Sequence, residues 1–117
     1  MRNVLKEKSF EFAIRIVKLI KYLQEEKKEF VLSKQLLRSG TAIGALVAEA
    51  QFGQSRADFL SKMYIALKEA NESIYWTELL HATEYLNDSQ FQSIYDDSKE
   101  ILAILISTTK TIKETKK

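Results

Sequence analysis

Glu78 and His81 are the residues whose type and spacing best suit chemistry, because they form a Glu-x-x-His pattern. Four-helix di-iron proteins use this spacing, but their sites need two such patterns and two further carboxylates. The chain has one histidine, so one copy does not complete such a site. His81 also falls on the apolar seam of its expected helix, where hydrogen-bonded core histidines are more frequent than ligands. We therefore expect no metal and no cofactor.

Nucleophilic catalysis and phosphate-loop chemistry have no support in the sequence. The chain lacks cysteine, and the spacing positions no base beside Ser39, which lies inside an expected helix. Gly40 and Gly44 also lie within that helix and follow no strand, so they do not form a nucleotide-binding loop. These patterns favour a protein that is not an enzyme.

Composition indicates one all-α domain over residues 1–117. Proline is absent and only three glycines occur, which favours long uninterrupted helices. The longest apolar run, residues 101–106, is far too short to span a membrane, and no leader pattern begins the chain. The absence of cysteine makes a reducing cytoplasm the natural compartment.

Apolar residues recur at helical spacing in four segments, residues 3–26, 33–53, 55–86 and 89–113. Ser33 and Gly53 are interpreted as the N-cap and C-cap of the second segment, and Ser55 with Asp58 resembles a capping box. Short connections between four helices most simply give an antiparallel up-down-up-down four-helix bundle. The second helix carries small residues four apart, Gly40, Gly44 and Ala48, and we expect another helix to pack closely against them.

The helices carry more apolar surface than one core requires, which predicts a homo-oligomer. The alternative is that the residues are assigned to the wrong side of their helices by a small rotation. In that case they belong to the ordinary core of a single chain. Arg38 and Glu49 flank a floor of small residues and either pair across a subunit boundary or belong to a solvated face. The interface candidates are Ile14, Arg38, Ala42, Ala45, Glu49, Tyr75, Trp76, Leu79, Ile104 and Ile106.

The net charge of +2 is divided unevenly, because both ends of the chain are basic and its middle is acidic. In the expected topology the fourth helix ends near the start of the first, which collects a basic pole suited to RNA or another polyanion. The pole consists of Arg2, Lys6, Lys8, Lys110, Lys113, Lys116 and Lys117. Arg15 and Lys18 either contact phosphates or belong to a solvated face. Tyr75 and Trp76 could stack on bases, but nearby glutamates favour subunit packing.

Two stretches carry a family resemblance: QLLRSGTAIGALVAEA at residues 35–50 and SRADFLSKMYIALKEANESIYWTELL at residues 55–80. They resemble the four-helix-bundle proteins encoded in intervening sequences of bacterial 23S ribosomal RNA. In relatives the segment at residues 48–50 often reads Ala-Glu-Gly, so Ala50 is a mild departure. The resemblance implies an antiparallel bundle that assembles as a ring, with pentamers as the known pattern.

The same resemblance extends to accessory proteins of diversity-generating retroelements, which bind nucleic acid and a reverse transcriptase through a basic surface. A biochemical role for the family at large is not established. The leading hypothesis is a non-catalytic cytoplasmic homo-oligomer that binds RNA through its basic pole. The alternative is a structural or adaptor protein that binds a protein such as a polymerase and no nucleic acid.

Overall fold

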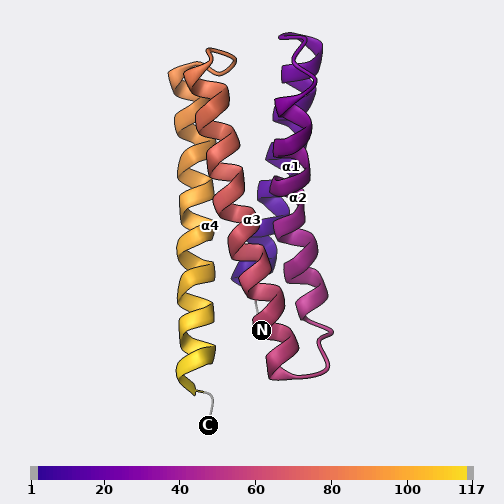
Figure 1. Ribbon diagram of the computed structural model, residues 1–117, viewed down its shortest axis with the longest axis vertical. Helices are drawn as coiled ribbons and strands as arrows, with labels where there is room; N and C mark the ends of the chain where they lie inside the picture. Colours follow the sequence, from indigo (N-terminus) through magenta and orange to yellow (C-terminus); the bar gives the residue numbers. More distant parts are fainter. Residues whose placement is uncertain (1–2, 116–117) are drawn as a thin grey trace.

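A computed structural model describes residues 3–115 of the chain, with side chains over residues 3–113. It contains four helices, α1 (Val4–Glu25), α2 (Leu32–Ala50), α3 (Arg56–Ala82) and α4 (Asp88–Thr115), and no strand among the described residues. In Figure 1 the α1–α2 and α3–α4 connections lie at the top and the α2–α3 connection at the bottom. The bundle measures 50 × 24 × 21 Å. Helix α2 contacts α1 and α3, and α4 contacts α3 broadly but α1 over a smaller surface.

The N-terminus of α2 differs from the prediction, because Ser33 is not its N-cap. The helix begins at Leu32, and the Glu29 carboxylate accepts hydrogen bonds from the N–H groups of Leu32 at 3.0 Å and Ser33 at 2.6 Å. Ser33 is buried, and its hydroxyl donates to the Glu29 carbonyl at 2.8 Å. Glu29 therefore satisfies donors that the first turn of any helix leaves unpaired.

Two predicted helix ends are also wrong. Helix α2 ends at Ala50, and Gly53 lies beyond it without the positive φ of a left-handed C-cap. Helix α3 ends at Ala82 and not at residue 86, because Glu84 adopts φ 68° and turns the chain. The Leu86 side chain then packs into the core, and only 2% of it is exposed.

Three N-caps are satisfied by local side chains. At α1, the Asn3 side chain accepts a hydrogen bond from the Lys6 N–H at 3.0 Å. The Ser55 hydroxyl accepts a hydrogen bond from the Asp58 N–H at 3.1 Å, as the capping-box pattern predicts. At α4, the Asn87 side chain accepts from the Gln90 N–H at 2.8 Å, and the Gln90 side chain accepts from the Asn87 N–H at 2.9 Å. This reciprocal pair fixes the start of α4 in the turn that the sequence indicates.

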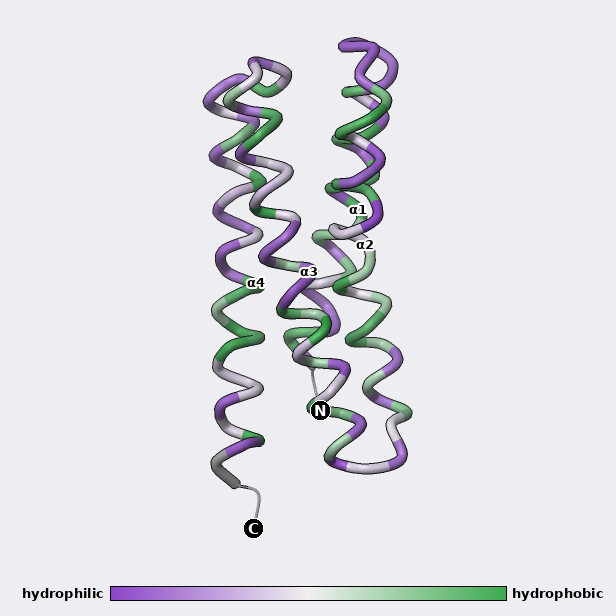
Figure 2. The backbone as a smooth tube through the Cα atoms, in the orientation of Figure 1, coloured by the Kyte–Doolittle hydropathy of each residue, from purple (hydrophilic) through white to green (hydrophobic). Residues whose placement is uncertain are grey.

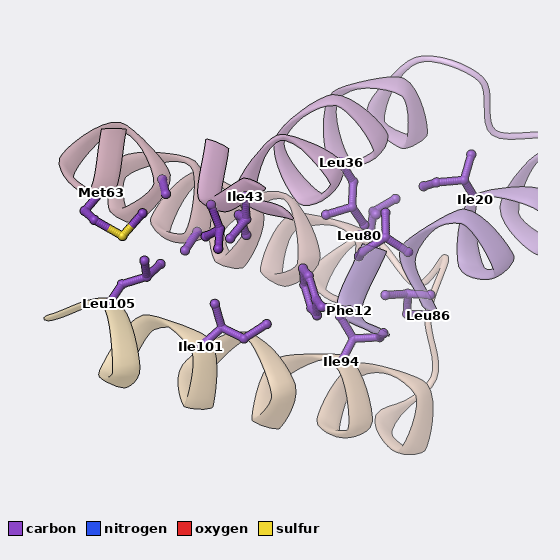
Figure 3. Close-up of a cluster of buried hydrophobic side chains, with 14 of the residues drawn as sticks. Phe12, Ile20, Leu36, Ile43, Met63, Leu80, Leu86, Ile94, Ile101 and Leu105 are labelled. Atoms are coloured by element: carbon purple, nitrogen blue, oxygen red, sulfur yellow. The ribbon is translucent and has the colours of Figure 1, made fainter. Parts of the chain in front are cut away.

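One apolar core runs through the bundle, and Figure 2 shows hydrophobic residues recurring along all four helices. In Figure 3, Met63 lies near Leu105 at one end of the core, and Leu80 and Leu86 lie toward the other. The fully or largely buried core residues are Phe12, Ile16, Ile20, Leu23, Leu36, Ile43, Val47, Ala50, Met63, Ala66, Ala70, Ile74, Leu80, Leu86, Ile94, Ile101 and Leu105. Leu5, Leu19, Leu67 and Phe91 pack on its margin, half-buried.

The helix that approaches Gly40 and Gly44 is α1. A Cβ on Gly40 would lie 2.9 Å from Ile16 Cγ1, and a Cβ on Gly44 would lie 3.2 Å from the carbonyl oxygen of Ser9. The missing side chains thus let α1 lie directly on the backbone of α2. This packing offsets the roughly 1 kcal/mol that each glycine costs in helix propensity.

Candidate functional site

His81 lies at the end of the bundle and not on a buried seam. Its side chain is 32% exposed, because α3 ends one residue later at Ala82. Its Nε2 lies 2.8 Å from Asp88 Oδ1, and its ring stacks on Phe91 with centroids 4.1 Å apart. Glu78 is exposed, and the described residues contain no group of three potential metal ligands. These contacts give His81 a structural role in joining α3 to α4.

Arg38 is paired within its own chain. Its guanidinium binds the carboxylates of Glu69, at 3.2 Å, and Glu72 on α3. Glu49, the partner considered for Arg38 across a subunit boundary, lies 3.2 Å from Lys62 Nζ. Arg38 and Glu49 therefore both have partners on α3. The spacing of Glu69 and Glu72, three residues apart on one helix face, could have predicted a shared cation.

Trp76 extends this cluster through its indole N–H, which donates to Glu72 Oε2 at 2.9 Å. That hydrogen bond lowers the pKa of the Glu72 carboxyl most strongly, and Arg38 lowers it further against the opposing effect of burial. Trp76 is half-buried, while the adjacent Tyr75 is 55% exposed. The indole is thus held by an acidic side chain, a poor setting for stacking on a phosphate-bearing strand.

Large apolar side chains remain exposed on α1, α3 and α4. On α1, Phe10, Ile14 and Val17 are 66%, 42% and 39% exposed and form one stripe at helical spacing. Ile106 on α4 is 49% exposed. The other interface candidates Ala42, Trp76, Leu79 and Ile104 are half-buried, and Ala45 is exposed. The candidates therefore come from all four helices, and Ile14 belongs to the most continuous apolar stripe.

The basic candidates divide into three groups. Lys6, Lys110 and Lys113 are exposed, and Figure 1 draws the start of α1 and the end of α4 in the same lower half of the molecule. Lys8 is tied to α4, since its Nζ lies 3.3 Å from the Glu100 carboxylate. Arg2, Lys116 and Lys117 lie outside the described residues. Three of the seven candidates are thus exposed cations at one half of the bundle.

Arg15 also bridges α1 and α4. Its guanidinium pairs with the Asp97 carboxylate and donates to the backbone and side-chain oxygens of Ser93. Next to this bridge the two helices leave a cleft, which Lys18 and Tyr22 also line. Sequence reasoning singled out Arg15 and Lys18 for their charge but could not predict the cleft, because it depends on how α1 and α4 meet.

A comparison with known protein families matches most of the bundle. The model of a family described as 23S rRNA-intervening sequence protein matches residues 2–107. The chain belongs to the 23S rRNA-intervening sequence protein family. This confirms the resemblance carried by residues 35–50 and 55–80.

A solved structure agrees with this assignment. The crystal structure of a protein of unknown function from the S23 ribosomal protein family of Bacteroides thetaiotaomicron is 60% identical to this family member. The match covers 91% of this chain and 98% of that chain, with a TM-score of 0.89. No curated protein matches the chain. Between residues 3 and 115, none of the helices has the length and apolar character that crossing a membrane requires.

Proposed function

We propose that this member of the 23S rRNA-intervening sequence protein family is a non-catalytic, homo-oligomeric bundle that binds RNA or another nucleic acid in the cytoplasm. Its helices form an antiparallel up-down-up-down bundle, and its basic pole makes the contact. The observation that supports this most is the exposure of Lys6, Lys110 and Lys113 in the half of the bundle where α1 begins and α4 ends. Exposed lysines bind phosphates through release of counterions.

Assembly of several copies strengthens the binding of RNA when each single chain binds it weakly. The exposed stripe of Phe10, Ile14 and Val17 supports self-association, and the family resemblance points to a pentameric ring. Each copy in such a ring carries its own basic pole. Several poles that bind one strand together raise the overall affinity, although each single chain binds no more tightly than before.

The test measures retention of labelled RNA across a salt series. We compare the native chain with a triple variant, Lys6→Gln, Lys110→Gln and Lys113→Gln. Its matched control replaces three exposed lysines elsewhere, Lys21, Lys34 and Lys68, by glutamine. Because both variants lose the same charge, the position of the lysines alone distinguishes them.

The native protein is expected to bind with a steep salt dependence. For a single strand the slope of log K against log salt falls by about 0.7 for each phosphate that the protein no longer neutralises, so the pole variant should have the shallower slope. The control variant should keep most of the native slope. No RNA binding by the native chain, or equally weakened binding by both variants, would contradict the proposal.

A structural or adaptor role is the second candidate, favoured by the same apolar stripe on α1. Phe10 is 66% exposed, and an apolar stripe of this kind can receive a helix of another protein, for example of a polymerase. Nuclease-treated extract separates the two roles. A specific partner protein that the native chain recovers and the Phe10→Lys variant does not would favour the adaptor.

A further inference from the structure

A cleft of about 500 Å³ opens between α1 and α4, beside the Arg15 bridge. Its size falls within the range of about 300 to 1,000 Å³ that is usual for small-molecule sites. The side chains that matter for its chemistry are Arg15, Lys18, Leu19 and Tyr22 from α1, and Gln90, Ser93 and Ile94 from α4. The cleft is separate from the basic pole, since its lining includes none of the pole residues.

The charges at the cleft favour an anion. Two cations, Arg15 and Lys18, line it, and no carboxylate does. Asp97 pairs with Arg15 and, together with Ser93, holds the guanidinium in place, which reduces its net charge but fixes its position. Lys18 is exposed and has no ion pair with any side chain among residues 3–113. Its ammonium is therefore available to a phosphate.

The remaining lining suits a planar ring with polar edges. Leu19 and Ile94 supply apolar surface, and Tyr22 supplies an aromatic ring. Gln90 uses its side-chain oxygen to accept from the Asn87 N–H, so its amide N–H groups are left to donate to a ligand. Aromatic stacking together with a side-chain amide is the usual chemistry of base recognition.

A second hollow, of about 350 Å³, determines how such a ligand is oriented in the cleft. It shares Tyr22 and Gln90 with the cleft, so the two adjoin, but its lining includes two carboxylates, Glu84 and Asp88, against one lysine, Lys27. Asp88 is paired with His81, and the excess of carboxylates over lysine disfavours a phosphate there. The phosphate therefore belongs at the Lys18 end of the cleft and the ring at the Tyr22 end.

We propose that the α1–α4 cleft binds a nucleotide, with the phosphate at Lys18 and Arg15 and the base against Tyr22 and Gln90. This site goes beyond the proposed RNA binding at the basic pole and does not depend on it. The nucleotide is either a free mononucleotide or one unit of an RNA strand, and both present the same chemistry to the cleft.

The experiment titrates the full chain with adenosine 5′-monophosphate and follows the Tyr22 ring resonances by NMR. Adenosine and inorganic phosphate are titrated separately, and each should bind about tenfold more weakly than the monophosphate. The variant Lys18→Gln should weaken binding of the monophosphate about five- to tenfold. Lys21→Gln removes an equal charge from the same helix outside the cleft and should leave the affinity unchanged.

Titration with a short oligoadenylate distinguishes the two sources. If the oligoadenylate shifts the Tyr22 resonances and Lys18→Gln weakens its binding, the cleft takes one unit of an RNA strand. If only the monophosphate shifts these resonances, the ligand is a free nucleotide. The inference is overturned if the monophosphate does not saturate the Tyr22 shifts, if phosphate alone binds as well, or if Lys18→Gln and Lys21→Gln behave alike. Failure to retain RNA while the cleft still binds the monophosphate would overturn the proposed function alone.

Discussion

A Cβ atom on Gly40 would lie 2.9 Å from Cγ1 and 3.0 Å from Cγ2 of Ile16, closer than such atoms pack in proteins. Ile16 is fully buried, so its side chain has no open space into which it can move. The position of α1 on α2 is therefore fixed by the absence of one methyl group.

Gly40→Ala is expected to destabilise the protein although it improves helix propensity. Alanine gains about 1 kcal/mol over glycine in a helix, but overpacking a rigid core costs about 1–3 kcal/mol, so we expect a net loss of about 1 kcal/mol. Chemical denaturation at fixed protein concentration measures this change. In an Ile16→Ala background the clash is absent, and Gly40→Ala should then stabilise. An equal effect in both backgrounds would show that Ile16 is not the cause.

The Glu29 cap makes the stability of α2 dependent on pH. Burial raises the pKa of the Glu29 carboxyl, but hydrogen bonds from the N–H groups of Leu32, Ser33 and Val31 outweigh this and hold the pKa below its ordinary value. A carboxyl with a lowered pKa stabilises the fold above its unfolded pKa. That contribution is lost as the pH falls through the folded pKa.

Glu29→Gln is therefore expected to cost about 1–2 kcal/mol near pH 7, the size of a removed N-cap. The difference from the native chain should shrink as the pH falls through the ordinary glutamate range and below it, because the lowered pKa keeps the native carboxyl charged to a lower pH than in the unfolded chain. Thermal unfolding at several pH values measures it, with the exposed Glu26→Gln as the control. A difference that stays constant between pH 7 and pH 3 would contradict the role of the Glu29 charge.

Trp76 reports on the ionisation of Glu72, because it is the only tryptophan of the chain and donates to that carboxylate. The pKa of Glu72 is lowered, so Trp76 fluorescence should stay constant from neutral pH to below the ordinary glutamate range and change only then. Arg38→Gln removes one cause of the lowering and should move this transition to higher pH. Lys34→Gln, a charge change on the same helix, should not move it. An unchanged midpoint in Arg38→Gln would contradict the pairing.

Much of the fold follows from local patterns in the sequence. Ser55 and Asn87 cap their helices through side chains close in sequence, and the glycines of α2 mark a tight approach between helices. One error arises because serine is a favoured N-cap type and therefore points to Ser33. In the fold Ser33 is buried inside the first turn, and the Glu29 carboxylate accepts from the N–H groups there instead.

A non-glycine residue in the left-handed region explains the misplaced end of α3. Glu84 has φ 68°, in a position where glycine is the usual guide. The partners of Arg38 and the cleft beside Lys18 depend on how helices far apart in sequence meet. Periodicity places a residue on a face of its own helix, but it does not give the neighbouring helix or its register.

The apolar stripe on α1 makes self-association the most direct property to test. Phe10, Ile14 and Val17 lie on one side of the helix and remain exposed, and a buried interface would remove them from water. We expect the native chain to be a homo-oligomer at micromolar concentration by light scattering. Ile14→Glu should dissociate it, because an unpaired carboxylate is costly to bury, while the circular dichroism spectrum keeps its helical content.

Asn71→Glu is the matched control, since it adds the same carboxylate at an exposed position of α3 away from the stripe. This variant should keep the native mass. A native chain that is monomeric, or an Ile14→Glu variant of unchanged mass, would show that the stripe on α1 does not hold copies together. In that case its exposed side chains would be free for a partner protein, and Phe10→Lys in the nuclease-treated extract would become the decisive measurement.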